Sequence, residues 1–278
     1  MTTTLRPTGP LQQEATGARS RGYEVRDNSR PVGTIEIATL PWPGARTGAL
    51  RSLRIDEADR RRGRGTVAAL AAEEVLRGWG CTRVRVSVPE TEAASRFAAV
   101  LGYAELGRYM AKILPDRPPA LPPGTAARPM DDAEFALWWE TDLDFYLGSW
   151  TDRGLAPAEA LARAEADRAA ALPDGRATVG VRLEVLEHEG EPVGHLYLGR
   201  REVLPGEQGA YVYDVEVAEE HRGRGHGRSL MLLAERYALE SGVRLLGLHV
   251  LAGNTRARGL YDSLGYRTTS VNAAKQLL

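Results

Sequence analysis

The sequence contains little that would support a disulfide, a membrane span or a nucleic-acid surface. Its 278 residues include one cysteine, Cys81, which excludes an intrachain disulfide and a cysteine metal cluster. Only Lys112 and Lys275 are lysines, and the formal net charge of −1 gives no electrostatic reason to expect nucleic-acid binding. The first twenty residues lack the apolar core of a signal peptide, and no apolar run is long enough to cross a bilayer. We therefore expect a cytoplasmic enzyme or binding protein that contacts no membrane.

The composition is that of a globular protein, and the length allows two domains of ordinary size. Hydrophobic residues make up 43% of the chain and charged residues 26%. Residues 1–21 are polar and predict a flexible tail. Five prolines fall between residues 115 and 123, so we place a linker at residues 116–124. The ranges 22–115 and 125–278 both alternate predicted strands and helices, which favours two domains.

One stretch of the second range joins a predicted strand, Ala210–Val217, to a helix with apolar residues at helical spacing from Leu230 to Tyr237. The first N–H groups of a helix lack intrahelical partners, and glycine lets a phosphate approach the backbone closely. The connecting loop holds three glycines and three arginines: Gly223, Gly225, Gly227, Arg222, Arg224 and Arg228. This pattern predicts an anion-binding site, and a flexible surface turn rich in arginine and glycine is the alternative.

The sequence also repeats itself. Arg62-Gly63-Arg64-Gly65 recurs 160 positions later as Arg222-Gly223-Arg224-Gly225. Leu101-Gly102-Tyr103 recurs 163 positions later as Leu264-Gly265-Tyr266. A duplication of strand, glycine loop, helix, strand and helix predicts two homologous α/β domains and argues against a single large barrel.

Two motifs in the second half have the spacing of a known family. Arg222-x-x-Gly225-x-Gly227 follows the predicted strand, and Asn254-x-x-Ala257-x-x-Leu260-Tyr261-x-x-Leu264-Gly265-Tyr266 follows later. Together they resemble the GNAT superfamily of acyl-CoA-dependent N-acetyltransferases, fully over residues 125–278 and in part over residues 23–114. The resemblance implies an α/β (α+β) fold with two GNAT-like domains, each a mixed central sheet flanked by helices, the N-terminal one truncated.

The resemblance implies acetyl-CoA as the acyl donor, without a metal. Its pyrophosphate would lie on the N–H groups of the glycine loop, and its pantetheine arm would pair with the backbone of about Val215 and Val217. Asn254 would touch this arm or cap the following helix. The residues expected to bind the cofactor are Val215, Val217, Arg222, Gly223, Arg224, Gly225, His226, Gly227, Arg228 and Asn254.

The same resemblance implies that Tyr261 is the general acid that protonates the leaving thiolate. The reference pKa values of a phenol and a thiol are comparable, so this transfer would be nearly balanced. A core aromatic residue at helical spacing is the alternative. Asp214 and Glu216 lie two apart on a strand, hence on one face, and one of them, with Glu216 favoured, would take the proton of the amine. Both could instead orient the acceptor or lie at the surface.

We expect direct attack of a small-molecule primary amine in a ternary complex, with the identity of the amine left open. Tyr146 and Trp150 either form an aromatic wall of the acceptor pocket or belong to the core. The tandem layout is similar to that of mycothiol synthase, which is one alternative, and an acyl-CoA sensor or scaffold without turnover is another. The protein would be a monomer in which the two domains form a pseudo-dimer, or a homodimer.

The first half departs from the family pattern. In the register of the glycine motif, Val67 stands opposite Gly227, where a β-branched side chain would crowd a phosphate. Ala98 stands opposite Tyr261, so the acid is missing, and Thr91 stands opposite Asn254. The two helices that open the second half have no counterpart. We therefore expect a degenerate first domain that keeps the fold and has lost catalysis.

Overall fold

The structure, a computed structural model, describes residues 3–15, 17–40, 47–151 and 156–277, apart from the side chains of residues 142, 144–146 and 148–151. The chain divides into two compact units. Of the described residues, those up to 107 and those from 270 to 277 belong to the first unit, and those in 108–151 and 156–269 belong to the second. The range 116–124, expected as a linker between domains, falls inside the second unit, and the C-terminal residues belong to the first.

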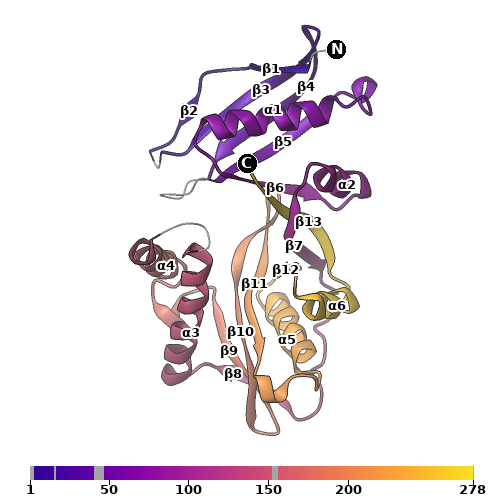
Figure 1. Ribbon diagram of the computed structural model, residues 1–278. Helices are drawn as coiled ribbons and strands as arrows, with labels where there is room; N and C mark the ends of the chain where they lie inside the picture. Colours follow the sequence, from indigo (N-terminus) through magenta and orange to yellow (C-terminus); the bar gives the residue numbers. More distant parts are fainter. Residues whose placement is uncertain (1–2, 16, 41–46, 152–155, 278) are drawn as a thin grey trace. The chain divides into compact units, whose positions relative to one another are not determined.

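The first unit is a mixed β-sheet with two helices on it (Figure 1). In chain order it contains β1 (Thr3–Pro7), β2 (Gln12–Gln13), β3 (Arg19–Asp27), β4 (Arg30–Thr39), β5 (Thr47–Ile55), η1 (Glu57–Asp59), α1 (Arg64–Gly78), β6 (Arg83–Pro89), α2 (Glu92–Val100), the start of β7 (Ala104–Ile113) and most of β13 (Arg267–Gln276). The sheet order is β1-β3-β4-β5-β6-β13, with β2 beside β3. Strands β5 and β6 run parallel because α1 connects them, and α1 packs on β1, β4 and β5.

The prediction of a flexible tail at residues 1–21 is wrong for the residues that the structure describes. β1 runs antiparallel to β3, from Thr3 opposite Asp27 to Pro7 opposite Tyr23. Leu5 packs against the buried cluster of this unit. One apolar residue among polar neighbours gave no alternating pattern, so the strand depends on a partner that the local sequence does not reveal.

The second unit is also a mixed sheet, with two helices preceding its longest strands (Figure 1). It contains the rest of β7, then β8 (Thr125–Pro129), α3 (Asp132–Thr151), α4 (Pro157–Ala171), η2 (Gly175–Ala177), β9 (Arg182–His188), β10 (Glu191–Leu204), β11 (Glu207–Val217), η3 (Glu219–His221), α5 (His226–Glu240), β12 (Leu245–Leu251), α6 (Thr255–Ser263) and the start of β13. The sheet order is β7-β12-β11-β10-β9-β8, and β11 runs parallel to β12.

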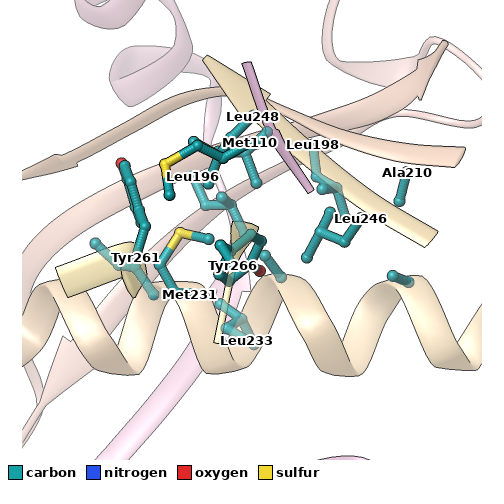
Figure 2. Close-up of a cluster of buried hydrophobic side chains, with 14 of the residues drawn as sticks. Met110, Leu196, Leu198, Ala210, Met231, Leu233, Leu246, Leu248, Tyr261 and Tyr266 are labelled. Carbon is teal, nitrogen blue, oxygen red and sulfur yellow. The ribbon is translucent and has the colours of Figure 1, made fainter. Parts of the chain in front are cut away.

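The core of the second unit lies between its sheet and α5. Met231 and Leu233 of α5 belong to one buried cluster with Leu196, Leu246 and Leu248 of the sheet, and Met231 lies on the side of the helix that faces these leucines (Figure 2). These side chains are at most 3% exposed, so the face that α5 turns to the sheet is fully removed from water. Among the described helices, none has the length and apolarity that crossing a membrane would require.

The last strand of each half of the sequence completes the sheet of the other half. The part of β13 that belongs to the first unit runs antiparallel to β6, and Ala273 lies in that unit's buried cluster. β7 neighbours β12, and Met110 and Leu114 lie in the buried cluster of the second unit. This reciprocal exchange of strands explains why the units are not the contiguous ranges 22–115 and 125–278 that we expected.

The two lysines of the chain mark this exchange. Lys275 Nζ on β13 lies 2.7 Å from a carboxylate oxygen of Glu73 on α1, and Lys112 Nζ on β7 lies 2.6 Å from Glu235 on α5. Both glutamates are buried, at 4% and 2% exposure. Lys112 and Lys275 are 163 positions apart, so equivalent residues of the repeat make equivalent ion pairs in opposite units.

The secondary structure also fixes the register of the repeat. Helix α1 begins at Arg64 and α5 at His226, 162 positions later, and both contain 15 residues. Helices α2 and α6 begin at Glu92 and Thr255, 163 positions apart. The offset of 160 taken from the glycine motif is therefore wrong by two residues, because Arg-Gly-Arg-Gly matches itself when shifted by one Arg-Gly step.

Candidate functional site

The loop between β11 and α5 has the backbone of an anion-binding turn. Gly223 and Gly225 have φ values of +85° and +91°, which favour glycine, and Gly225 is the N-cap of α5. In the described part of the chain, the backbone N–H groups of residues 223–227 have no backbone acceptor. These N–H groups and the helix dipole together favour a negatively charged ligand.

This loop opens into a cavity of about 330 Å³ that lies entirely within the second unit. Every residue expected to bind the cofactor lines the cavity except Arg224. The described lining residues are Val215, Val217, Arg222, Gly223, Gly225, His226, Gly227, Arg228, Met231, Asn254, Arg256, Ala257, Leu260 and Tyr261. A Cβ added to Gly227 would lie 3.3 Å from Leu260 Cδ2, so this glycine also lets α5 approach α6 closely.

Positive charge gathers at this cavity. Arg222 Nε donates to the Val217 carbonyl at 3.1 Å, and an Nη of Arg228 lies 2.6 Å from Ser263 Oγ. Arg256, in the first turn of α6, also lines the cavity and was not predicted from the sequence. Its position two residues after the Asn254 cap could have placed it at the start of this helix, beside the cavity. Three guanidinium groups on one small cavity suit a ligand with several phosphate oxygens.

His226 lies at the first position of α5 and is buried, at 6% exposure. Its ring centroid lies 5.0 Å from that of His188 and 6.2 Å from that of His221. Burial, followed by the neighbouring histidines and Arg224, lowers the pKa of His226 below its usual range. The described residues contain no group of side chains arranged to hold a metal ion, so these histidines do not form a metal centre within that part of the chain.

Tyr261 also lines the first cavity. It lies on α6, whose N-terminus is capped by the Asn254 side chain, which accepts from the Ala257 N–H at 3.1 Å. Asn254 therefore caps this helix and also lines the cavity. Tyr261 is 6% exposed and lies at the margin of the cluster in Figure 2. Burial, followed by the charge of Asp214, raises the pKa of Tyr261 to about 12.

Strand β11 separates two cavities because of its pairing. The parallel register with β12 runs from Ala210 to Val212, while β11 continues to Val217. The register with β10 shifts next to Val212, which leaves Tyr213 as a bulge. Beyond this point Val215 and Val217 face the first cavity, and the intervening carboxylates face the opposite side of the strand.

The second cavity, of about 670 Å³, also lies within the second unit. It contains Asp214 and Glu216, which confirms that these two side chains share one face of the strand. The described lining residues are Met130, Glu134, Leu137, Trp138, Thr141, Val185, Pro192, Gly194, His195, Tyr197, Tyr213, Asp214, Glu216 and Ala218. The volume is within the range typical of small-molecule sites, roughly 300–1,000 Å³.

Asp214 is held by two side chains that the sequence did not indicate. Its Oδ2 accepts from Trp138 Nε1 at 2.9 Å and lies 2.9 Å from His195 Nε2. Burial by itself would raise the pKa of Asp214, but His195 and Trp138 outweigh it, and the net shift is downward. A carboxylate with a lowered pKa is a weaker base, so Asp214 is suited to orient groups around it.

Glu216 is in a more open position. Its side chain is 51% exposed, and one oxygen lies 3.2 Å from an Nη of Arg222. Arg222 therefore reaches from the loop of the first cavity to a carboxylate of the second. The side chains of Tyr146 and Trp150, expected as a possible acceptor wall, lie outside the described residues. Trp138, Tyr197, Tyr213 and His195 are the residues that tertiary packing adds to the site.

The first unit repeats the loop more closely than the sequence suggested. With the offset of 162, Arg60-x-x-Gly63-x-Gly65 lies opposite Arg222-x-x-Gly225-x-Gly227. Gly63 caps α1 with a φ value of +74°, as Gly225 caps α5. Gly65, and not Val67, is therefore the counterpart of Gly227, and the expectation that Val67 crowds the phosphate position is wrong.

The catalytic candidates have no counterparts in the first unit. Ala98 occupies the position of Tyr261, as expected. Ser52 and Arg54 occupy the positions of Asp214 and Glu216, because a bulge at Arg51 repeats the bulge at Tyr213. In the described part of this unit, no helix precedes the strands in the way that α3 and α4 do in the second. Loop and sheet are thus duplicated, while the groups around the second cavity are not.

Comparison with known proteins agrees with this duplication. The model of the acetyltransferase (GNAT) family matches residues 4–103 and 135–266. An uncharacterized N-acetyltransferase of Bacillus subtilis, YycN, is 35% identical over 107 residues, which are 38% of this chain and 68% of that protein. A second from the same bacterium, YdgE, is 30% identical over 131 residues, 47% of this chain and 80% of that protein.

Among solved structures, a GCN5-related N-acetyltransferase from Sphaerobacter thermophilus is similar with a TM-score of 0.56. The two chains are 18% identical, and the alignment covers 92% of this chain and 80% of the other. At this identity the likeness concerns the fold alone, a mixed sheet flanked by helices.

Proposed function

Because this chain belongs to the acetyltransferase (GNAT) family, whose model matches it in two ranges, we propose that its second unit acetylates a small-molecule primary amine. The acetyl group comes from acetyl-CoA, and the amine attacks the thioester directly while both are bound. One observation carries this proposal: strand β11 lines both cavities, with Val215 and Val217 on one side and Asp214 and Glu216 on the other. We place the donor in the first cavity and the acceptor in the second, so that both lie against this strand.

The residues of the first cavity fit an acyl-CoA. The N–H groups of residues 223–227 and the guanidinium groups of Arg222, Arg228 and Arg256 provide donors and charge for a pyrophosphate. Beyond Val212, strand β11 has no register with β12, which leaves backbone groups for an extended arm to pair with. Acetyl-CoA supplies the thioester that the amine attacks.

Tyr261 donates a hydrogen bond to the leaving sulfur. With a pKa of about 12, its hydroxyl keeps its proton at neutral pH. A thiol has a reference pKa of about 8.5, so full transfer of the proton to the thiolate is uphill by roughly 3.5 units. The nearly balanced transfer expected from reference values therefore becomes mainly stabilisation of the developing thiolate by a hydrogen bond.

Glu216 accepts the proton of the amine, and Asp214 orients the surrounding side chains. The lowered pKa of Asp214 and its two hydrogen-bond partners make it the poorer base of the pair. The half-exposed carboxylate of Glu216 can exchange protons with water. Its ion pair with Arg222 links occupation of the donor loop to the position of the base.

The first unit, by the same reasoning, does not catalyse. It has Ala98 in place of the acid, and Ser52 and Arg54 in place of the carboxylates. We assign the first unit a structural role: its half of the sequence supplies β7 to the sheet of the second unit and receives β13 in return.

The test is acetyl transfer from acetyl-CoA to a panel of amines, followed through the released thiol. Tyr261→Phe should lower kcat by about 100- to 1,000-fold, the range expected for loss of one hydrogen bond to developing negative charge, and leave the Kd for CoA nearly unchanged. Tyr211→Phe is the matched control, because Tyr211 is a buried tyrosine of the same unit that is not among the described residues lining either cavity. Its kcat should stay within about threefold of the wild type.

Tight CoA binding without transfer to any amine of the panel would contradict the proposal and favour an acyl-CoA sensor. Equal loss of activity in both variants would show that the effect is not specific to the hydroxyl group in the cavity, and it would contradict the role assigned to Tyr261.

A further inference from the structure

We infer that the acceptor is an amine carried on an aromatic or otherwise apolar body without an acidic group, an inference that rests on the proposed acetyl transfer. It follows from the composition of the second cavity, whose lining divides into an aromatic wall and a set of carboxylates. Each part selects a different half of such a molecule.

The aromatic wall is a continuous arrangement of three rings. The Trp138 and Tyr197 centroids lie 5.6 Å apart in an edge-to-face contact, and Tyr197 stacks on Tyr213 at 4.8 Å. Trp138 and Tyr197 are 7% and 9% exposed, so packing fixes their orientation before any ligand arrives. Tyr213, at the bulge, is 42% exposed and offers ring surface to a ligand. Preformed rings bind flat apolar groups with little loss of side-chain entropy.

The polar part of the lining carries oxygen acceptors. Asp214, Glu216 and Glu134 contribute carboxylates, and none of the described residues that line this cavity is lysine or arginine. The cations that pair with two of them, Arg128 with Glu134 and Arg222 with Glu216, are not among these lining residues. An ammonium group is attracted by the carboxylates and by the faces of the rings.

A carboxylate on the acceptor would be repelled by the carboxylates that attract an ammonium group. The two side-chain N–H groups nearest Asp214, those of Trp138 and His195, lie within hydrogen-bond distance of its own Oδ2. An acidic acceptor would therefore place its charge near Asp214 and Glu216, where the neighbouring guanidinium group of Arg222 is already paired with Glu216. Like charges in a partly desolvated cavity repel each other, so amines with an α-carboxylate are excluded.

The experiment compares matched pairs of amines: tryptamine with tryptophan, and phenethylamine with phenylalanine. We expect kcat/KM for each amine to exceed that of its amino acid by at least about 100-fold, the scale on which a pocket rejects an unpaired charged group. A ratio near or below one, or an aliphatic diamine preferred to both aromatic amines, would overturn the inference.

A substitution tests the physical reason. Leu137 lines the cavity from α3 and is 68% exposed, so Leu137→Arg adds a cation without disturbing the core. It should lower the preference for tryptamine over tryptophan by at least about tenfold, because the carboxylate gains a partner. Leu161→Arg is the control: Leu161 is an exposed leucine of α4 that is not among the described lining residues, and the preference should not change. An unchanged preference in Leu137→Arg would contradict the electrostatic explanation.

Binding separates this inference from the proposed function. Calorimetric titration of the CoA-loaded protein should detect tryptamine and not tryptophan, and Tyr213→Ala should weaken the binding of tryptamine. Selective binding of tryptamine without acetyl transfer would support the acceptor class and refute the enzyme. Transfer to amino acids at equal rates would support the enzyme and refute the acceptor class, and absence of binding by either compound would refute it as well.

Discussion

Helices α2 and α6 hold equivalent places in the two units, yet one presents Ala98 where the other presents Tyr261. Both positions are 6% exposed, and both helices begin with a side-chain cap, from Thr91 in one and Asn254 in the other. The capped helix thus serves the fold in both units. Because the cap is kept where the tyrosine is absent, a family motif has to be divided into its structural and its chemical residues before function is inferred from it.

The glycine loops before α1 and α5 also share their structural residues and differ at one position. Arg60 Nε donates to the Ile55 carbonyl at 2.8 Å, as Arg222 Nε donates to the Val217 carbonyl at 3.1 Å. The first helical residue differs: Arg64 is buried in ion pairs with Asp27 and Asp59, where the second unit has His226. The loop of the first unit is therefore held from inside by charge, which explains how it keeps its shape independently of any ligand.

The largest effect on stability is expected from the exchanged lysines. Lys275→Met leaves the buried carboxylate of Glu73 without its cation and should destabilise the first unit by about 3 kcal/mol, the lower end of the range for a broken buried pair, because the lysine is partly exposed. Lys112→Met should do the same to the second unit. Hydrogen exchange measured on peptides from each unit shows which unit has lost stability. Arg77→Met is the control, since the Arg77–Glu74 pair is exposed and is worth less than about 0.5 kcal/mol.

The comparison would fail if Lys275→Met destabilised peptides of the second unit, because the exchange assigns β13 from Ser270 onward to the first.

An intermediate effect is expected from the two cap glycines. Gly63→Ala and Gly225→Ala place a side chain at φ values of +74° and +91° with no neighbour within 4 Å. The cost is therefore torsional and should be about 1 kcal/mol for each unit. Only Gly225→Ala should also raise the KM for acetyl-CoA. A comparable rise in Gly63→Ala would show that the first loop takes part in donor binding.

The smallest effect concerns pH. Because the pKa of His226 is lowered by burial, the folded second unit binds fewer protons at this site than the unfolded chain. Its contribution to stability is therefore complete above the unfolded pKa of about 6.5 and is lost as pH falls through the folded pKa. The first unit has Arg64 and no histidine at the equivalent position, so denaturant unfolding between pH 7 and pH 5 should show the second unit weakened relative to the first.

His226→Gln removes the titrating group and should flatten this difference. A pH dependence that persists in His226→Gln would mean that other groups cause it.

Local patterns in the sequence were sufficient for much of the fold. Alternation, helical spacing and glycine caps predicted most elements and the duplication, and two motifs identified the family. They also brought Asp214 and Glu216 to one face and Tyr261 to the cavity that contains the loop. Each of these depends on residues close in sequence, whose relative placement a strand or a helix fixes directly.

The sequence did not predict contacts between residues that are far apart along the chain. The edges of β6 and β12 are equivalent in the repeat, so no local residue tells β7 and β13 which edge to join. His195 and Trp138 are far from Asp214 in sequence and meet it only through packing. The wrong register of the glycine motif has a different cause. The two Arg-Gly-Arg-Gly sequences were aligned by residue identity, whereas the residues with left-handed φ values that cap the two helices, Gly63 and Gly225, define the structural alignment.

The exchanged strands also determine the order in which the two units can finish folding during synthesis. A chain is synthesised from its N-terminus, and domains commonly fold as they emerge from the ribosome. Here the first unit lacks β13, together with Ala273 and Lys275, until the residues beyond 269 have been made. Until the second half has been translated, β6 has no neighbour on that edge of its sheet, so a nascent chain that stalls late would expose an unpaired strand that can aggregate.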